Sequence, residues 1–527
     1  MSAEMIHPLA SIEPRLRPLL PADVYASTWV DPSPTTLMGV FEHLRTLQQI
    51  MRDYVPRHLL ESVPTPGKVR FKWQAGTLMF TDLAGYTPLM EASAAKGREG
   101  AATLLGLLNS YFAEMIEIVS KSGGNLLEFT GDAILVEFPP EPAQAVRAGL
   151  RMQRAMTRFE NIETEMGTFN FGMRVGVHTG RYLTGDIGTP QRMESVLLGN
   201  AVQETKRAEG AGVVGRICLT KAVYKEVEKD FTFEEGAPGY MLVVDDLSDT
   251  QLGEYELAAP SGRRLSSAVL FDRSIEGLTS EIDSALGHLE PFAPFVPAPI
   301  LKVLVESASQ REIPPDFPEP TVVFVNLIGP PEAVDSAEGD EERSVVESFS
   351  RAFALINAAV DARGGVLKKV TYHLAGSDIM IFFGVPNSHT DDPVRAADAA
   401  LAIREIINNL EPISVGSDEV RAECQIGMAT GRAFAAEIGE PRGRREFNVI
   451  GDVVNTSARL MGRAINNRIL MTEDVYERIK DDFEVKSLGP TRFKGKAKPV
   501  SIYSLVGYPG ENGDQSDTEE TRENDSR

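Results

Sequence analysis

The sequence alternates short apolar runs with longer segments in which apolar residues recur every three or four positions. The short runs include TLMF at 77–80, AILVEF at 133–138 and MRVGV at 173–177, and their length and composition predict β-strands. The segment EGAATLLGLLNSYFAEMIEIVSKSG at 99–123 has the periodicity of an amphipathic helix. This alternation predicts an α+β fold in which helices pack on a mixed sheet.

The same pattern occurs twice along the chain, at a distance of about 250 residues. GTLMFTDLAGYT at 76–87 matches PTVVFVNLIGPP at 320–331, and VGVHTGRYLTGDIG at 175–188 matches IGMATGRAFAAEIG at 426–439. Further matching blocks follow in the same order. The repeat therefore predicts two tandem domains with one fold.

The segments outside the repeat are less regular. Residues 36–63 have the pattern of one amphipathic helix leading into the first domain, which we expect the N-terminal region to support. The connector is rich in proline near its end, and we expect one helix in it. The predicted division is an N-terminal helical segment at 1–71, a first domain at 72–258, a linker at 259–316, a second domain at 317–508 and a disordered acidic tail at 509–527.

Composition narrows the class of partner. A net charge of -23 disfavours nucleic acid and anionic membrane surfaces. The N-terminus has no apolar core of a signal peptide, and apolar runs stay short of a membrane span, so we expect a cytoplasmic protein. The two cysteines indicate neither a disulfide framework nor a zinc site. The basic cluster Arg442, Arg444 and Arg445 is best interpreted as a solvated hairpin tip, with phosphate binding as the alternative.

Two aspartates in the first domain stand where a metal-phosphate site could form. Asp82 follows the apolar run TLMF, and Asp132 lies in LLEFTGDAILVEF, which predicts a tight hairpin. Each alone could be a turn former. Together, exposed on adjacent elements, they could hold two Mg²⁺ ions about 4 Å apart, which would activate a hydroxyl and neutralise a triphosphate.

The second domain has complementary residues. Asn326 and Ser377 replace the two aspartates, so this half should not bind metal. It carries Asn455 and Arg459, four residues apart on one predicted helix face, where they could stabilise a phosphoryl transition state or could simply be solvated. The first domain has Gln203 and Arg207 at the matching positions. Complementary losses of this kind predict one site shared between the two halves.

The motifs FTDLAGYT, TGDA, GVHTGR and GDVVNTSARL together resemble those of the class III adenylyl and guanylyl cyclases. The resemblance covers both repeats, and the tandem arrangement is similar in particular to the bicarbonate-responsive soluble adenylyl cyclases. It implies two ferredoxin-like domains packed head to tail as an intramolecular pseudo-heterodimer. The implied chemistry is attack of the ribose 3'-hydroxyl on the α-phosphate, with two Mg²⁺ or Mn²⁺ ions and release of pyrophosphate.

The resemblance also implies roles for individual residues. Asn455 would orient the ribose and Arg459 the α-phosphate, while Asn448 would read the purine. In the first domain, metal would be held by Asp82, Asp132 and the Leu83 carbonyl, and the phosphates would lie near Ala84, Gly85, Tyr86 and Thr87. Arg181 and Lys494 would contact the triphosphate.

The choice between ATP and GTP, and any regulation by a small anion, depend on positions that depart from the family pattern. The usual lysine before the second hairpin falls between His373 and Ala375, and Lys368 or Lys369 could substitute for it. We expect ATP, with GTP as the alternative, because Glu128 resembles a guanylyl cyclase residue but faces the degenerate half. That half would be bordered by Glu128, Val196, Lys206 and Arg207, and family precedent suggests bicarbonate or another small anion there, although Glu128 would repel an anion.

Two other classes of function remain open from the sequence. The chain could sense a nucleotide or an anion without turnover, or it could be a scaffold. We expect a monomer containing the internal pseudo-dimer, with ATP or GTP as its nucleotide partner.

Overall fold

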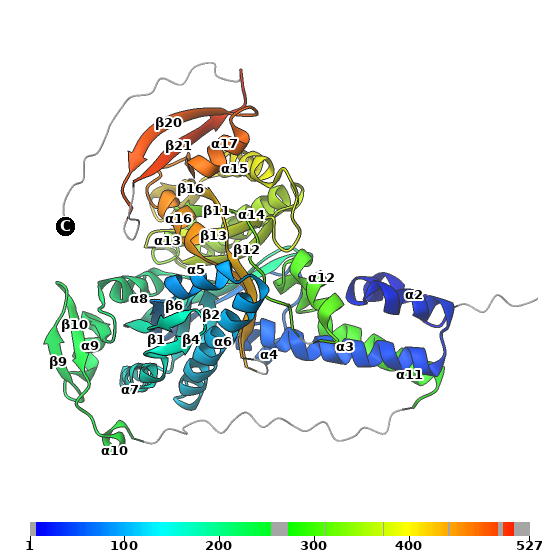
Figure 1. The fold of residues 1–527 in the computed structure, drawn as a ribbon, viewed down its shortest axis with the longest axis horizontal. Helices are drawn as coiled ribbons and strands as arrows, with labels where there is room; N and C mark the ends of the chain where they lie inside the picture. Colours follow the sequence, from blue (N-terminus) through cyan, green and yellow to red (C-terminus); the bar gives the residue numbers. More distant parts are fainter. Residues whose placement is uncertain are drawn as a thin grey trace, which may run out of the picture.

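The computed structural model describes residues 7–253, 272–310, 312–372, 374–440, 443–493 and 499–510. Two sheet-and-helix domains pack against each other, and a group of helices extends from them (Figure 1). The predicted pair of tandem α+β domains is confirmed.

The first domain is built on an eight-stranded sheet. Its central strands follow the order β2-β3-β1-β6 and are connected as βαββαβ, which is the ferredoxin-like arrangement. The sheet continues through β8, β10 and β9, and β7 pairs with the far end of β6. The elements are β1 (Arg70–Ala84), α5 (Thr87–Ala95), α6 (Arg98–Lys121), β2 (Asn125–Thr130), β3 (Ala133–Phe138), α7 (Pro142–Ala155), η2 (Met156–Phe159), β4 (Ile162–Thr164), β5 (Gly167–Phe169), β6 (Gly172–Gly188), β7 (Met193–Leu198), α8 (Asn200–Ala211), β8 (Ile217–Thr220), α9 (Lys221–Val227), β9 (Thr232–Glu235), β10 (Tyr240–Val244) and α10 (Asp249–Leu252).

The second domain repeats this plan in a seven-stranded sheet of order β12-β13-β11-β16-β19-β21-β20. Its hairpin β17-β18 is separate from that sheet, whereas the corresponding part of the first domain is continuous with β6. The elements are β11 (Thr321–Ile328), α13 (Pro330–Ala333), α14 (Asp340–Asp361), β12 (Val366–Tyr372), β13 (Ser377–Phe383), α15 (Asp392–Asn408), β14 (Ile413–Val415), β15 (Asp418–Val420), β16 (Glu423–Thr430), β17 (Phe434–Gly439), β18 (Arg445–Ile450), α16 (Asp452–Met461), β19 (Arg468–Thr472), α17 (Glu473–Ile479), β20 (Glu484–Thr491) and β21 (Val500–Gly507).

The two domains exchange parts of their cores. Ile438 and Ile450 of the second domain are buried in the hydrophobic core of the first. Ile187 and Val196 of the first domain are buried in the core of the second. Burial of each domain's apolar side chains inside its neighbour stabilises the pair as one unit and fixes how the halves face each other.

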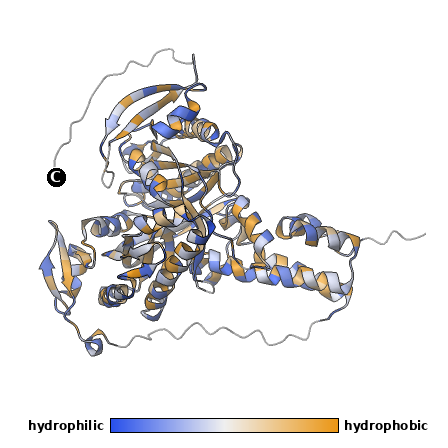
Figure 2. Cartoon of the chain, in the orientation of Figure 1, coloured by the Kyte–Doolittle hydropathy of each residue, from blue (hydrophilic) through white to orange (hydrophobic). Residues whose placement is uncertain are grey.

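The N-terminal helices and the connector helices form one packed group, visible at the right of Figure 1. Both α3 and α11 mix hydrophobic and hydrophilic residues along their length (Figure 2), and their apolar stripes meet. This group packs on the second domain, because its core includes Phe324, Phe447 and Val453. Its elements are α1 (Glu13–Leu16), η1 (Arg17–Leu19), α2 (Ala22–Val30), α3 (Pro34–Tyr54), α4 (Arg57–Glu61), α11 (Ile275–Leu289), η3 (Ala293–Phe295) and α12 (Ala298–Ser307).

Three expectations about these segments were wrong. The helix predicted at 36–63 is broken into α3 and α4, because Pro56 lacks an N–H and disfavours helical backbone at Val55. The connector carries two α-helices instead of one. The N-terminal helices pack mainly on the second domain, and contact the first through His58 of α4. The predicted tail lies outside the described residues from position 511 onward.

One described helix, α6, is long and apolar enough to cross a membrane by length and composition alone. Its residues Leu104, Leu108, Phe112 and Met115 are fully buried in the first domain's core. The apolar face of α6 is therefore accounted for by packing on its own sheet.

Candidate active site

Asp82 lies near the end of β1, where that strand is paired on both sides. The residues opposite it are Ala133 on β3 and Arg174 on β6. The Arg174 guanidinium forms an ion pair with the Asp82 carboxylate and also lies 3.1 Å from Glu209 on α8. Strand pairing thus places a carboxylate and a guanidinium side by side at a partly exposed sheet end.

Asp132 lies in the tight turn between β2 and β3, next to Asp82. Burial and the charge of Asp82 raise the pKa of Asp132 to about 7. The Tyr86 hydroxyl lies close to Asp132, and burial together with the Asp132 charge raises the pKa of Tyr86 well above its ordinary value. Two carboxylates that repel each other across a short distance are a site whose charge a cation would balance.

The donor set fits Mg²⁺ or Mn²⁺. These ions prefer hard oxygen ligands, and Mg²⁺ is commonly held by one or two carboxylates together with substrate phosphates. No group of three or more His, Cys, Asp or Glu side chains suited to a metal occurs within the described ranges. Asp82 and Asp132 would therefore hold the metals with backbone carbonyls such as that of Leu83, with water and with substrate.

The loop from Ala84 to Thr87 connects β1, the strand that carries Asp82, to helix α5. Gly85 has a φ of +89°, and a Cβ there would lie 2.3 Å from the Asn170 carbonyl oxygen, so the turn requires glycine. Thr87 is the first residue of α5, whose free N–H groups start beside Asp82. A helix N-terminus in this position favours bound phosphate.

The second domain reaches this site through α16. Asn455, on its first turns, lies close to the Tyr86 hydroxyl of the first domain. Ile450, just before α16, packs against the Asp132 turn, since its Cγ2 lies 3.5 Å from the position of a Cβ on Gly131. Arg459 follows one turn after Asn455 and is half-buried. The structure therefore brings the acidic half and the asparagine-arginine half to the same place.

The arginine expected at the triphosphate is the wrong one. Arg181 is opposite Ala75 on β1, seven residues along β6 from Arg174, and it stacks over Trp73 with its guanidinium carbon 4.7 Å from the ring centre. Seven residues of strand correspond to roughly 23 Å. Arg174 occupies the position beside Asp82, and the strand register that shows this could not be read from the motif.

The strand register also resolves which lysine stands before the second hairpin. Phe129 pairs with Ile134 and Val370 pairs with Ile379, so Lys369 occupies the position of Glu128. The turn of the second hairpin is longer than that of the first. Counting back from that turn in the sequence therefore gives His373, a residue outside the described ranges, instead of Lys369. Lys494 also lies outside the described residues.

Lys369 and Asn448 lie close to the first domain's hairpin. The Lys369 ammonium hydrogen-bonds to the Phe129 carbonyl and lies 3.1 Å from Glu446 and 3.5 Å from Glu128. Asn448 is 1% exposed, and its Nδ2 has no hydrogen-bond partner among the residues that the structure describes. A buried amide donor without a partner is a group that a ligand could satisfy.

The second domain's equivalent of the metal site is closed. The Asn326 amide donates to the Ala375 carbonyl at 2.9 Å and lies 3.4 Å from Gln425, which occupies the position of Arg174. Ser377 is buried in the same hairpin. All three charged groups of the first domain's site are thus replaced by neutral ones here.

The four residues expected to border a regulatory anion site do not converge. Val196 is buried in the second domain's core, and Lys206 lies 4.0 Å from the Phe80 ring centre and 2.9 Å from Glu209. Arg207 donates to the Leu374 carbonyl at 2.8 Å, whereas Glu128 faces Lys369. The four side chains thus have separate surroundings in this structure, because position on a shared motif does not fix the direction of long side chains.

The expectation that the basic cluster around Arg444 and Arg445 is a solvated hairpin tip was wrong. Arg445 is 5% exposed and is paired with Glu437 and with Asp53 of α3, and Arg444 donates to the Asp53 and Tyr54 carbonyls. Both arginines join the N-terminal helix to β18 instead of facing solvent. Arg442 lies outside the described residues.

The fold and the site are those of the nucleotidyl cyclase class, and comparison with known protein families gives the same class. Residues 72–243 and 315–507 match the family described as adenylate and guanylate cyclase catalytic domain, and the chain belongs to this family.

The chain spans about a quarter of the length of the adenylate cyclase type 10 proteins that it matches. Adenylate cyclase type 10 of Mus musculus is 24% identical over 422 residues, which cover 75% of this chain and 24% of that protein. An adenylate cyclase of Mycobacterium tuberculosis is 30% identical over 217 residues, covering 41% of this chain and 45% of the relative. A solved class III adenylyl cyclase-like ATP-binding protein from Pseudomonas aeruginosa shares the fold over 83% of this chain and 92% of that one, with a TM-score of 0.52 at 14% identity.

Proposed function

We propose that the chain converts ATP into 3',5'-cyclic AMP and pyrophosphate at the single site between its two domains. One observation carries the proposal: the Tyr86 hydroxyl of the first domain lies close both to Asp132 of that domain and to Asn455 of the second. Metal-binding carboxylates and a neutral hydrogen-bonding amide thereby face the same space. The corresponding place in the other half has Asn326 and Ser377 and cannot hold the metals.

The reaction is an in-line attack of the ribose 3'-oxygen on the α-phosphorus. A bond forms between these atoms, the bond to the bridging oxygen of the β-phosphate breaks, and the 3'-hydroxyl proton is lost to solvent. Divalent ions, when bound at Asp82 and Asp132, would supply charge neutralisation on the phosphates and on the attacking oxygen. No covalent bond to the protein is needed.

The chain's own residues would position the substrate. The first N–H groups of α5 and the Arg174 guanidinium would face the β- and γ-phosphates, since both lie beside Asp82. Asn455 would hold the ribose, and Arg459 would reach the α-phosphate, where negative charge increases in the transition state. Tyr86, which is buried and uncharged, would keep the two halves in register.

ATP is the proposed nucleotide, with GTP as the alternative. Lys369 occupies the position at which adenylyl cyclases carry a lysine, as the resemblance implies, and Asn448 offers an unpaired amide donor to the base. The named relatives are adenylate cyclases. We also propose that the protein acts in the cytoplasm as a single chain, with both halves of the site supplied in cis.

The test is product formation by the full chain with Mg²⁺ or Mn²⁺, given ATP and GTP in parallel. Asp132→Asn should abolish product, because the carboxylate is lost with little change of shape. Ser377→Ala, the matched substitution at the degenerate half, should retain turnover. Cyclic GMP as the main product would replace ATP by GTP in the proposal.

A second candidate is nucleotide binding without turnover. Its support is the fold shared over most of the chain with a protein described as ATP-binding and cyclase-like. In that case ATP would bind with measurable heat while neither cyclic nucleotide forms with either metal, and Asp132→Asn would change binding alone.

A further inference from the structure

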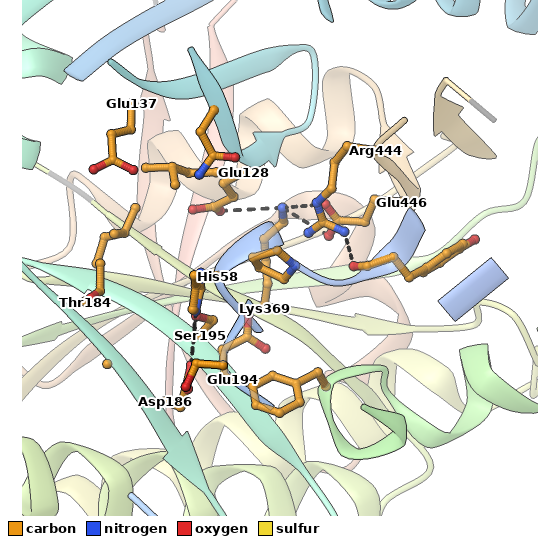
Figure 3. A pocket seen from close by; sticks show the side chains of 18 of the residues that line it. His58, Glu128, Glu137, Thr184, Asp186, Glu194, Ser195, Lys369, Arg444 and Glu446 are labelled. Atoms are coloured by element: carbon orange, nitrogen blue, oxygen red, sulfur yellow. Dashed lines mark hydrogen bonds and ion pairs between the residues drawn. The ribbon is translucent and has the colours of Figure 1, made fainter. Parts of the chain in front are cut away.

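A cavity of about 510 Å³ lies between the two domains; it is lined by Glu128 and Lys369 but not by the metal-site aspartates. Its walls come from β2, β6 and β7 of the first domain, from β12 and β18 of the second, and from the chain between α3 and α4 (Figure 3). Asp82, Asp132 and Asn455 do not line it, and neither do Val196, Lys206 and Arg207. Its volume is within the range of small-molecule sites.

The buried cations on the cavity wall are already engaged. Lys369 is held by the Phe129 carbonyl, Glu446 and Glu128, and Lys368 is paired with Glu446. Burial alone raises the pKa of Glu446, but the charges of Lys368, Lys369 and Arg444 outweigh it and lower that pKa to about 2. Arg444 donates to backbone carbonyls of α3. Glu446 therefore engages both lysines on this side of the cavity.

One carboxylate on the wall is left short of partners. The Glu128 Oε1 atom is buried, lies 3.5 Å from the Lys369 ammonium and has no hydrogen bond within the described part of the chain. Burial raises the pKa of Glu128 to about 7 against the opposing charge of Lys369, and the charges of Glu446 and Glu194 add to the rise. A buried carboxylate with an unused acceptor favours a cationic donor.

A different polar group on the wall does not act as a nucleophile. The Ser195 hydroxyl donates to Asp186 at 3.0 Å and lies 3.0 Å from the His58 Nε2, but Asp186 is also paired with Arg70. The carboxylate thus binds the serine directly instead of orienting the histidine's second nitrogen, which is the arrangement that activates a serine. This group closes one end of the cavity through hydrogen bonds.

Part of the lining is apolar and includes Phe71, Leu127, Leu197, Val296 and Ile300. From this combination, we propose that the cavity binds a small organic amine with an apolar body, whose ammonium group pairs with the Glu128 carboxylate.

The position of Glu128 gives such a ligand a route to the proposed cyclase site. Glu128 lies four residues before Asp132, and its partner Lys369 also holds Glu446, two residues before Asn448. An ammonium group at Glu128 would compete with Lys369 and change how the two hairpins are held together. This regulatory consequence rests on the proposed function, whereas binding itself does not.

The experiment measures binding to the full chain without nucleotide, by calorimetry at pH 8, where Glu128 is ionised. The probes share one skeleton and differ in charge: 2-phenylethylamine, 2-phenylethanol and 3-phenylpropionate. We expect the amine to bind at one site about tenfold more tightly than the alcohol, and the carboxylate not to bind. Glu128→Gln should remove this tenfold advantage, while Glu226→Gln, on the exposed face of α9, should leave it unchanged.

Leu197→Trp, which fills the cavity, should abolish binding of both the amine and the alcohol. The proposal is overturned if the carboxylate binds better than the amine, if Glu128→Gln leaves the amine's affinity unchanged, or if none of the probes binds at about 10 mM. A preparation that binds the amine but forms no cyclic nucleotide would overturn the proposed function alone.

Discussion

Two arginines on one strand provide a direct test of the proposed site. Arg174 and Arg181 lie on β6, but only Arg174 is opposite Asp82 in the strand register. Replacing each arginine by methionine removes one positive charge from β6. The two charges differ in their distance from Asp82, the proposed metal ligand. We expect Arg174→Met to lower kcat/KM for ATP strongly and Arg181→Met to have almost no effect.

The magnitudes follow from the geometry. At roughly 23 Å, a unit charge interacts with the site by only about 0.2 kcal/mol in water. Screening over about three Debye lengths at physiological salt lowers this to about 0.01 kcal/mol. Arg174, in contrast, would contact charge that develops on the phosphates, and removal of such a donor costs about 100- to 1000-fold in rate.

The assay is steady-state formation of cyclic AMP with Mn²⁺, together with thermal unfolding of each variant. Arg174 also balances Asp82 and Glu209, so its loss should lower the unfolding midpoint somewhat, and the comparison is made well below that temperature. A larger loss of kcat/KM in Arg181→Met than in Arg174→Met would refute the assignment made from strand register.

Three further outcomes test other parts of the structure. Because the pKa of Asp132 is raised to about 7, protons should compete with metal, and Mn²⁺ affinity measured by calorimetry should be about tenfold weaker at pH 6 than at pH 8; equal affinities would contradict this. Asn455→Ala should lower kcat about 100-fold, and kcat/KM equally, whereas Gln203→Ala at the degenerate half should change either by less than about threefold. Ile450→Ala, at a site 2% exposed inside the first domain's core, should cost about 2–5 kcal/mol in urea unfolding, and a loss below about 1 kcal/mol would argue against the exchanged packing.

Much of the architecture could be predicted from the chain because it depends on local pattern. The period of the apolar residues identifies strands and helices such as α6, and duplication of the blocks identifies two domains of one fold. The loss of both carboxylates at Asn326 and Ser377 is a fact of composition, and it indicates which half can bind metal before any geometry is known.

Other features depend on contacts between segments far apart in sequence. The helix at 36–63 follows a regular apolar pattern, yet Pro56 breaks it, and its partner helix α11 lies more than 200 residues away. No pattern within the N-terminal region identifies the second domain as its support.

The sequence by itself determined the fold class and the repeat and indicated the candidate metal carboxylates, because periodicity, duplication and ligand chemistry reside in single residues and their neighbours. Tertiary structure alone decided that Arg174 and not Arg181 stands beside Asp82, and that Lys369 takes the position of Glu128. It also decided that Glu128 faces a cavity between the domains instead of joining Lys206 and Arg207. The physical reason is that strand register and side-chain direction are set by packing across the sheet and across the domain interface, where a shift of one residue reverses the face to which a side chain points.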